Sequence, residues 1–302
     1  MNAPRVIPWS AAPGLLSEGP RWHEERQELL WVDILGKHVH RGTLGRDGAL
    51  GELTTITLDR HVGAVAPAES GGYVVAAGPG YLHIRPDGTL RELAQPAAGA
   101  GDVRMNDGAC DPQGRFWAGT MAYDESAGAG TLYRLELDGT TTTMLTGLTI
   151  SNGIGWSPDG SAMYLNDSGS GHVFAFDFDG PTGAIGGQRT LVHMDTPGVG
   201  PDGLTVDEEG GLWVAVWGGS AVHRYRPDGS LAEVVELPVE RPTSCAFGGR
   251  ARDTLFVTSA REGLSDVALA AQPHAGHVFA IDGLGVRGLP ALPYRGDLGQ
   301  SG

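Results

Sequence analysis

The sequence has few cysteines and no long apolar run, and each shortage excludes a class of protein. Its 302 residues include two cysteines, Cys110 and Cys245, which lie far apart in apolar segments. Such spacing excludes a disulfide-rich secreted scaffold, and we expect both thiols to be free and buried. No apolar run approaches the roughly 20 residues of a transmembrane helix. The N-terminus also lacks the apolar core of a secretory signal, so the sequence predicts a cytoplasmic protein with no membrane partner.

Basic residues are scarce as well. The chain carries 21 Lys and Arg against 36 Asp and Glu, which gives a formal net charge of −15. The basic residues are scattered, whereas surfaces that bind nucleic acids or anionic lipids need clustered positive charge. We therefore expect no nucleic-acid partner and an acidic, well solvated surface.

The chain does contain a segment that recurs six times, about every 45 residues. Each copy opens with a short polar turn and continues with an apolar strand that holds an aromatic residue, such as Leu30-Trp31-Val32 or Leu212-Trp213-Val214. The copies begin near Glu18, Val62, Asn106, Asn152, Asp202 and Thr243. This period without a helical pattern is typical of propeller blades. The sequence predicts an all-β fold, a single six-bladed β-propeller over residues 1–302 with about four antiparallel strands per blade.

Fourth strands are expected at 90–93, 142–145, 189–193 and 231–236. The outer strand of the sixth blade has two candidates, residues 286–292 and the N-terminal residues 5–9, and the second would close the ring and remove a free edge. Two segments interrupt the period: residues 123–130, either a lid or a mobile loop, and residues 262–275, with a short helix expected at 264–271. A closed ring leaves few exposed edges, so we expect a monomer.

Equivalent positions of six blades converge on one mouth of the central channel. The residues that precede the first small residue of each copy are Glu18, Val62, Asp107, Asn152, Asp202 and Ser244. Glu18, Asn152 and Asp202 are oxygen donors, and two of them are anionic. Oxygen ligands suit Ca²⁺, Mg²⁺ or Mn²⁺ and also occur with Zn²⁺ or Fe²⁺. Carboxylates crowded there without a cation would repel one another, so the pattern predicts a divalent metal site.

Asp202 also has a simpler interpretation as a turn residue. Pro201-Asp202-Gly203 repeats the tripeptide found at Asp87, Asp159 and Asp228, and Asn152-Gly153 is another turn dipeptide. The position in the repeat differs, however, because Asp202 and Asn152 precede a first strand, whereas the other three aspartates precede a second or fourth strand.

A basic residue lies near these candidates in the third copy. Arg104 and Asn106 share one face of an extended segment, and a cation beside an acidic metal site suits a hydroxylated or anionic ligand. The alternative is an ion pair of Arg104 with Asp102 or Asp107.

Four strings occur in order over about residues 16–281: Glu18-Gly19-Pro20-x-Trp22, the long segment from Arg104-Met105-Asn106-Asp107-Gly108 to Gly119-Thr120-Met121, Ser151-Asn152-Gly153-Ile154-Gly155-Trp156-Ser157, and Pro201-Asp202-Gly203-Leu204. In these strings the chain resembles the gluconolactonase family that includes regucalcin, the senescence marker protein. The resemblance implies a hydrolase acting on carboxylic ester bonds, a lactonase that converts an aldonolactone, a small sugar lactone, to its aldonic acid.

The resemblance also implies roles for individual residues. Glu18, Asn152 and Asp202 would hold one divalent metal, and Arg104 and Asn106 would bind substrate hydroxyls. The metal, whether Ca, Zn, Mn, Mg or Fe(II), would act as a Lewis acid, with Asp202 as the candidate general base.

The chain departs from the family pattern at one position. Tyr123 stands where animal members carry a glutamate that touches substrate, so we expect Tyr123 to contact substrate and the substrate to differ. The alternatives are a related hydrolase of esters or organophosphates, which an apolar pocket around Tyr123 would favour, and a propeller that binds metal or ligand without turnover.

Overall fold

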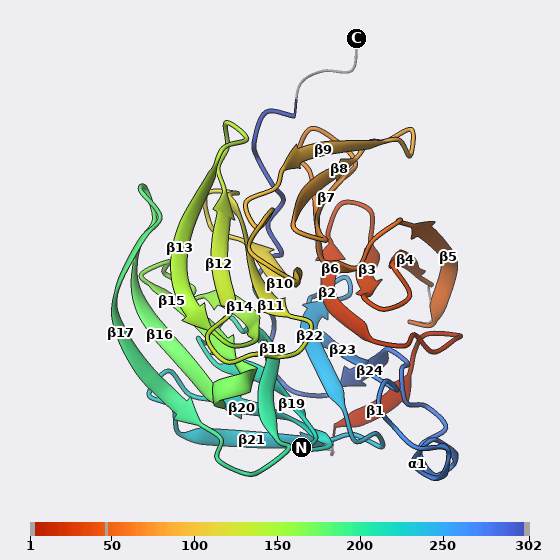
Figure 1. The fold of residues 1–302 in the computed structure, drawn as a ribbon. Helices are drawn as coiled ribbons and strands as arrows, with labels where there is room; N and C mark the ends of the chain where they lie inside the picture. Colours follow the sequence, from red (N-terminus) through yellow and green to blue (C-terminus); the bar gives the residue numbers. More distant parts are fainter. Residues whose placement is uncertain (1–3, 46–47, 299–302) are drawn as a thin grey trace.

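A computed structural model describes residues 4–45 and 48–298, and its strands form six four-stranded antiparallel sheets. The sheets stand around a central axis like the blades of a propeller, with the first strand of each repeat nearest the axis (Figure 1). The six-bladed all-β prediction is therefore confirmed. These innermost strands begin within three residues of the repeat starts expected from the sequence.

The first five blades are meanders of four consecutive strands. Blade 1 contains β2 (Ser17–His23), β3 (Glu28–Asp33), β4 (His38–Leu44) and β5 (Leu50–Thr57). Blade 2 contains β6 (Val62–Pro67), β7 (Tyr73–Ala77), β8 (Gly80–Ile84) and β9 (Leu90–Ala94). Blade 3 contains β10 (Val103–Cys110), β11 (Phe116–Ala122), β12 (Gly130–Leu135) and β13 (Thr141–Leu148). Blade 4 contains β14 (Ser151–Trp156), β15 (Ala162–Asp167), β16 (His172–Asp179) and β17 (Ala184–His193), with the 3-10 turn η1 (Ser168–Ser170) between β15 and β16. Blade 5 contains β18 (Gly200–Val206), β19 (Leu212–Trp217), β20 (Ala221–Tyr225) and β21 (Leu231–Glu236).

Blade 6 is assembled from both ends of the chain. It contains β22 (Pro242–Gly248), β23 (Thr254–Ser259) and β24 (Phe279–Asp282), and its outer strand is β1 (Arg5–Pro8). In Figure 1 the red β1 lies beside the blue β24, with Arg5 opposite Asp282 and Pro8 opposite Phe279. The N-terminal strand thus closes the ring. Residues 286–292 form no strand of blade 6, and their one bridge joins Gly288 to Asp207 of blade 5.

The other local expectations can be compared with the same structure. All four expected fourth strands are present, and the expected helix is α1 (Asp266–Ala271), whose first turn is capped by the Ser265 hydroxyl. Both cysteines are free and buried, as expected. In the described part of the chain, no helix combines the length and apolar character needed to cross a lipid bilayer.

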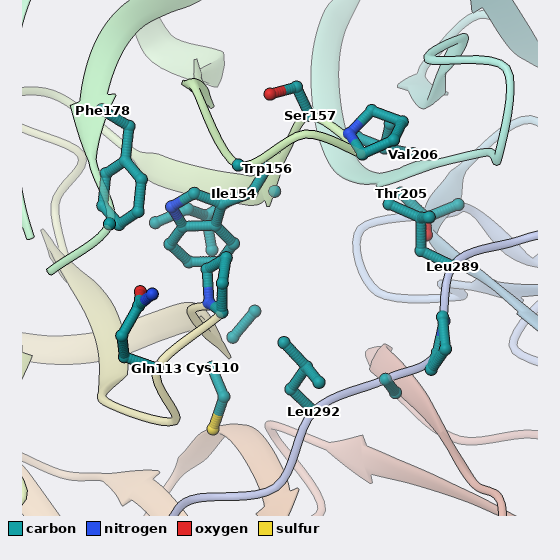
Figure 2. A pocket seen from close by; sticks show the side chains of 18 of the residues that line it. Cys110, Gln113, Ile154, Trp156, Ser157, Phe178, Thr205, Val206, Leu289 and Leu292 are labelled. Atoms are coloured by element: carbon teal, nitrogen blue, oxygen red, sulfur yellow. The ribbon is translucent and has the colours of Figure 1, made fainter.

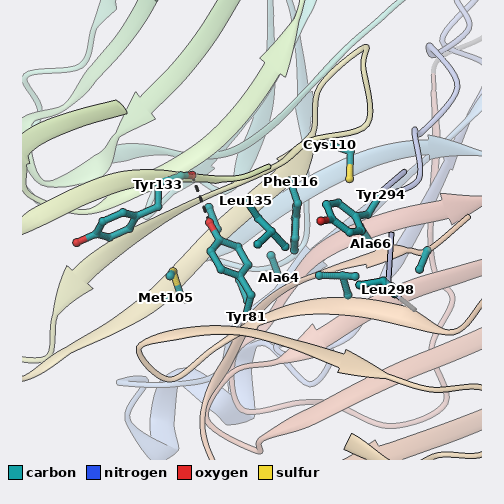
Figure 3. Close-up of a cluster of buried hydrophobic side chains, with 14 of the residues drawn as sticks. Ala64, Ala66, Tyr81, Met105, Cys110, Phe116, Tyr133, Leu135, Tyr294 and Leu298 are labelled. Carbon is teal, nitrogen blue, oxygen red and sulfur yellow. Dashed lines mark hydrogen bonds between the residues drawn. The ribbon is translucent and has the colours of Figure 1, made fainter. Parts of the chain in front are cut away.

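The hydrophobic core lies between neighbouring blades rather than inside any one of them. Six clusters of buried side chains each join two adjacent blades around the ring. Figure 3 shows the cluster between blades 2 and 3, where Tyr81 donates a hydrogen bond to the carbonyl oxygen of Tyr133 and packs edge-on against Phe116. Because both faces of the second strands are covered, these strands are apolar at nearly every position and show no alternation.

Trp9 follows the closing strand and provides a test of ring closure. Its ring lies edge-on to Phe256 at 5.0 Å and to Trp31 at 6.1 Å, and its side chain is 5% exposed. Trp9→Ala is expected to lower the free energy of unfolding by about 3–5 kcal/mol, because it leaves a cavity between blades 6 and 1. Urea unfolding measures the change. Val267→Ala, at an 81% exposed position of α1, is the control and should stay within about 0.5 kcal/mol of the parent. Equal effects of the two changes would contradict this account of closure.

Candidate metal and substrate site

One mouth of the central channel opens into a cavity of about 730 Å³. The cavity is lined by residues from the early part of the innermost strands and from the loops beside them. All six site residues expected from the sequence line it: Glu18, Arg104, Asn106, Tyr123, Asn152 and Asp202. Apart from Tyr123, none of the six is more than 6% exposed. The fold therefore brings together side chains that lie up to 184 positions apart in the sequence.

An irregularity in each innermost strand produces this arrangement. The pairing of the first and second strands shifts register once in every blade. Asn106, Asn152 and Asp202 occupy such β-bulges, and Glu18 directly precedes one. A bulge inserts an extra residue and redirects its side chain, which explains how residues inside regular strands come to face the cavity.

The structure corrects the expectation that equivalent residues of all six repeats meet at the mouth. Asp107, Val62 and Ser244 were expected at the mouth, but they do not line the cavity. In blade 3 the bulge lies at Asn106, one residue before the expected position of Asp107. Oδ1 of Asp107 lies instead 3.7 Å from Nη2 of Arg21. The spacing of repeats cannot locate a bulge to a single residue, which explains the error.

Hydrogen bonds fix the orientation of the Asn152 amide. The Ser168 hydroxyl donates to the carbonyl oxygen of Pro201 at 2.7 Å, so it accepts the 3.0 Å hydrogen bond from the Nδ2 group of Asn152. The Oδ1 atom of Asn152 then faces away from Ser168, and it is buried with no hydrogen-bond partner among the described residues. Oδ1 of Asp202 is likewise buried and unpartnered.

The Arg104 and Asn106 side chains are held in a similar way. Nη1 of Arg104 donates to Oδ1 of Asn106 at 2.7 Å, and Nδ2 of Asn106 donates to the carbonyl oxygen of Ser151 at 3.0 Å. Arg104 therefore pairs with Asn106 rather than forming an ion pair with Asp102 or Asp107. Its observed hydrogen bonds all use Nη1, so the donors on Nη2 and Nε remain for a ligand.

The carboxyl groups around this mouth are destabilised in their charged forms. Burial raises the pKa of Glu18 to about 8, and the charge of Asp107 adds to the rise. Burial, followed by the charges of Glu18 and Asp107, raises the pKa of Asp202 well above its usual range. A hydrogen bond from Asn152 and the positive charge of Arg104 oppose that rise. Buried carboxylates that repel one another would be stabilised by a cation.

The same tripeptide shows how different the environment of Asp202 is from that of a turn residue. Asp87, Asp159 and Asp228 are exposed, and each accepts a hydrogen bond from the backbone N–H two residues later. Hydrogen bonds lower the pKa of all three. Asp202 instead lies in the bulge of β18, is buried, and has a raised pKa. The turn interpretation is correct for the other three aspartates and wrong for Asp202.

The donor set fits a hard divalent cation. Glu18, Asn152 and Asp202 supply oxygen atoms only, and two of these oxygens are buried without a partner. Over residues 4–45 and 48–298, no cluster of three or more His, Cys, Asp or Glu side chains is arranged to hold a metal. The proposed set falls below that count because one of its three members is an amide.

Sequence reasoning missed several residues at this mouth. Ser168 lies in η1 and orients Asn152, yet no motif marks it. His61 contacts Tyr123 from the neighbouring blade, and Trp217 and Glu262 line the rim. These roles arise from tertiary contacts between blades. The one signal in the sequence was that each residue occupies a position in its repeat close to that of a candidate residue.

A second cavity, of about 690 Å³, lies at the other end of the innermost strands (Figure 2). Ile154, Trp156, Phe178 and Leu292 give it a largely apolar wall. None of the six expected site residues lines it. The polar mouth is therefore the candidate functional site.

The structure thus defines the class of this protein: it is a six-bladed propeller with buried oxygen donors at one mouth of its central channel. The chain belongs to the SMP-30/gluconolactonase/LRE-like family, whose model matches residues 16–261. Regucalcin from Sus scrofa is 41% identical over 92% of this chain and 94% of its own length. These findings confirm the family resemblance of the sequence.

Two solved structures of similar proteins cover almost the whole chain. A regucalcin from Agrobacterium tumefaciens, described as a calcium-binding protein, is 32% identical with a TM-score of 0.88, over 94% of this chain and 95% of that protein. A luciferin-regenerating enzyme is 32% identical with a TM-score of 0.89, over 97% of this chain and 100% of that protein. The names of these two similar proteins describe different properties, calcium binding and luciferin regeneration.

Removing the charge of Asp202 is expected to stabilise the metal-free protein. Asp202→Asn relieves repulsion among buried carboxylates and should raise the free energy of unfolding in the presence of a chelator by about 0.5–2 kcal/mol. Asp228→Asn, in the same Pro-Asp-Gly tripeptide, should give no gain because Asp228 is exposed and hydrogen-bonded. Chemical denaturation of both variants measures the difference. A loss of stability in Asp202→Asn would show that its carboxylate is not under electrostatic strain.

Proposed function

We propose that this protein is a metal-dependent lactonase that hydrolyses an aldonolactone of the gluconolactone kind to the aldonic acid. The observation that carries the proposal is the pair of buried, unpartnered oxygens, Oδ1 of Asn152 and Oδ1 of Asp202, in the cavity that also holds Arg104. Family membership supports the same reaction, because the family name includes gluconolactonase.

Glu18, Asn152 and Asp202 would hold the divalent cation, whether Ca, Zn, Mn, Mg or Fe(II). When bound, such a cation polarises the lactone carbonyl and stabilises negative charge on its oxygen. Two observations support this assignment: the donors are all oxygens, and a 32% identical relative is described as calcium-binding. Among the candidates, an oxygen-only set favours hard cations over Zn²⁺.

Arg104, Asn106 and Tyr123 would bind the substrate. Arg104 has uncommitted N–H groups and Tyr123 exposes 43% of its surface, so both can reach hydroxyls of a lactone in the cavity. The rigid hydrogen bonds of Arg104 and Asn106 hold these donors before substrate arrives, which lowers the entropy cost of orienting the lactone.

Asp202 would act as the general base. It takes a proton from the water that attacks the carbonyl carbon and returns it to the ring oxygen as the ring C–O bond breaks, which yields the aldonic acid. Burial and neighbouring charges raise the pKa of Asp202 and make it a stronger base. A bound cation opposes that rise, so this role requires one carboxylate oxygen to remain free of the cation.

A hydrolase of apolar lactones or esters is the second candidate. Leu16, Met121, Ile150 and Trp217 share the lining with the polar residues, so the cavity is only partly polar. A relative named for luciferin regeneration, at 32% identity, supports a substrate other than a sugar. For both candidates we propose a monomer, because β1 supplies the outer strand that blade 6 would otherwise lack and so closes the ring. We also propose that the protein is cytoplasmic and acts on a small molecule, which a cavity of about 730 Å³ can hold.

The lactonase proposal is tested by stripping the protein of metal and following acid release from glucono-, xylono-, arabinono- and galactonolactone. Ca²⁺, Mg²⁺, Mn²⁺, Zn²⁺ or Fe²⁺ is restored singly, aryl esters form a parallel panel, and spontaneous hydrolysis is subtracted. We expect metal-dependent turnover of at least one sugar lactone. At saturating metal, Asp202→Asn should lose at least about 100-fold in kcat, and Asp228→Asn should keep the parent rate.

The outcomes separate the candidates. Turnover of aryl esters alone would favour the second candidate. Tight metal binding without turnover of any substrate would leave a binding propeller. Full recovery of Asp202→Asn at high metal concentration would reject the role of Asp202 as base while keeping its role as ligand.

Ser168 is expected to control metal affinity through Asn152. Ser168→Ala removes the acceptor that orients the amide, and loss of such an outer contact typically weakens metal binding about 10–100-fold. Calorimetric titration of the metal-free protein measures this directly. Ser259→Ala is the matched control, because Ser259 also accepts from one N–H (Gly276) and donates to one carbonyl (His277), but in blade 6. Ser259→Ala should lower stability without changing metal affinity, and equal affinities for both variants would contradict the role of Ser168.

A further inference from the structure

Blade 2 contributes no polar side chain at the bulge of its innermost strand. Gly63 lies in this bulge, whereas the equivalent bulge of blade 4 contains Asn152 and Gly153. The nearest polar side chain of blade 2 is His61, directly before β6, whose backbone carbonyl oxygen accepts a hydrogen bond from Gly78. Among the described residues, none from blade 2 lines the cavity, so His61 can influence a ligand there only through the side chain that it holds.

His61 holds the side chain of Tyr123. Nδ1 of His61 lies 2.8 Å from the phenol oxygen of Tyr123, and the two rings are 5.5 Å apart. Tyr123 follows β11 of blade 3, and its backbone N–H donates to the carbonyl oxygen of Asp102. The contact thus joins blades 2 and 3 at the rim of the cavity. It restrains the side chain of Tyr123, which is 43% exposed.

The restrained phenol borders the residues proposed to bind substrate. Tyr123, Arg104 and Asn106 line the same cavity. Burial raises the pKa of Tyr123, whereas burial and the charge of Arg104 lower the pKa of His61. Both rings are therefore uncharged at neutral pH, and their hydrogen bond persists there.

The charges that line the cavity are mainly negative, so they disfavour anionic substituents on the substrate. Glu125, Asp195 and Glu262 line the cavity in addition to Glu18 and Asp202, and Arg104 is the one Arg or Lys in the lining. A lactone carrying a carboxylate or phosphate would meet a net negative wall. An uncharged hydroxyl remains the substituent that suits the phenol.

We propose that His61 is a positioning residue that fixes Tyr123 against the substrate, and that this pair selects uncharged lactones bearing a hydroxyl on the side of Arg104. The inference rests on the proposed lactonase function. His61 does not touch the reacting atoms. It holds the phenol oxygen where it can exchange a hydrogen bond with the substrate.

The test compares glucono-δ-lactone with δ-valerolactone, which has the same ring without hydroxyls, on the metal-loaded protein. His61→Ala and Tyr123→Phe should each raise KM for gluconolactone about three- to tenfold, the worth of one hydrogen bond, with kcat within twofold of the parent. The double variant should be no worse than either single variant, because both remove one interaction. The kcat/KM for δ-valerolactone should not change.

Two further variants separate positioning from a general structural effect. His61→Asn places an amide near the former Nδ1 and should restore KM. His223→Ala removes a histidine whose Nδ1 lies 2.9 Å from the phenol oxygen of Tyr225, in blade 5 and outside the cavity lining, and should leave KM unchanged. Multiplicative effects in the double variant, no effect of His61→Ala, or equal effects on both lactones would each overturn the inference.

Failure of the inference can be distinguished from failure of the lactonase proposal. Parent protein that hydrolyses gluconolactone while the variants match it keeps the lactonase and rejects the role of His61. If the parent hydrolyses no lactone with any metal, the same variants are titrated calorimetrically with 1,5-anhydroglucitol, an uncharged ring that carries the hydroxyls of gluconolactone. The same non-additive pattern in Kd then supports the pair, and an unchanged Kd or no binding rejects it.

Discussion

Packing between neighbouring blades is the constraint on which the rest of this structure depends. No blade has a core of its own, because each buried cluster is shared by two sheets. Each innermost strand is therefore positioned by its contacts with both neighbouring blades. Closure by β1 matters for the same reason, since Trp9 completes the cluster between the last blade and the first. A site assembled from four blades needs a scaffold of this rigidity.

The ring brings together at one mouth side chains that favour a ligand over an empty site. Burial raises the pKa of Glu18 and Asp202, and also that of Asp107, which does not line the cavity but whose charge adds to the rise at the other two. Such burial is unfavourable for the protein alone. Oδ1 of Asn152 adds a buried acceptor with no donor. Most of a protein avoids both conditions, and they are commonly tolerated where function requires them. The proposed cation would relieve the local instability of these residues.

Much of this could be predicted from the sequence, for physical reasons that differ between levels. The blades followed from the apolar strands and their aromatic residues, because the packing between blades repeats in every copy. Glu18, Asn152 and Asp202 followed from their shared place in the repeat and from family resemblance. Asp107 was misplaced because a bulge moves the side chain by one residue, and a repeat period does not record bulges. Ser168 and His61 were invisible because their partners come from other strands or other blades.

The tripeptide Pro-Asp-Gly shows why residue type alone is insufficient. At Asp228 it makes an exposed turn in which backbone and hydroxyl donors lower the pKa of the carboxyl. At Asp202 the same tripeptide lies at a bulge in an innermost strand, and burial there raises the pKa of the carboxyl. The difference comes from the position in the repeat, because only the first strand faces the channel. In a propeller, the position of a polar residue in the repeat therefore decides its role. Such a residue becomes a candidate for function when it lies where the innermost strand departs from regular pairing.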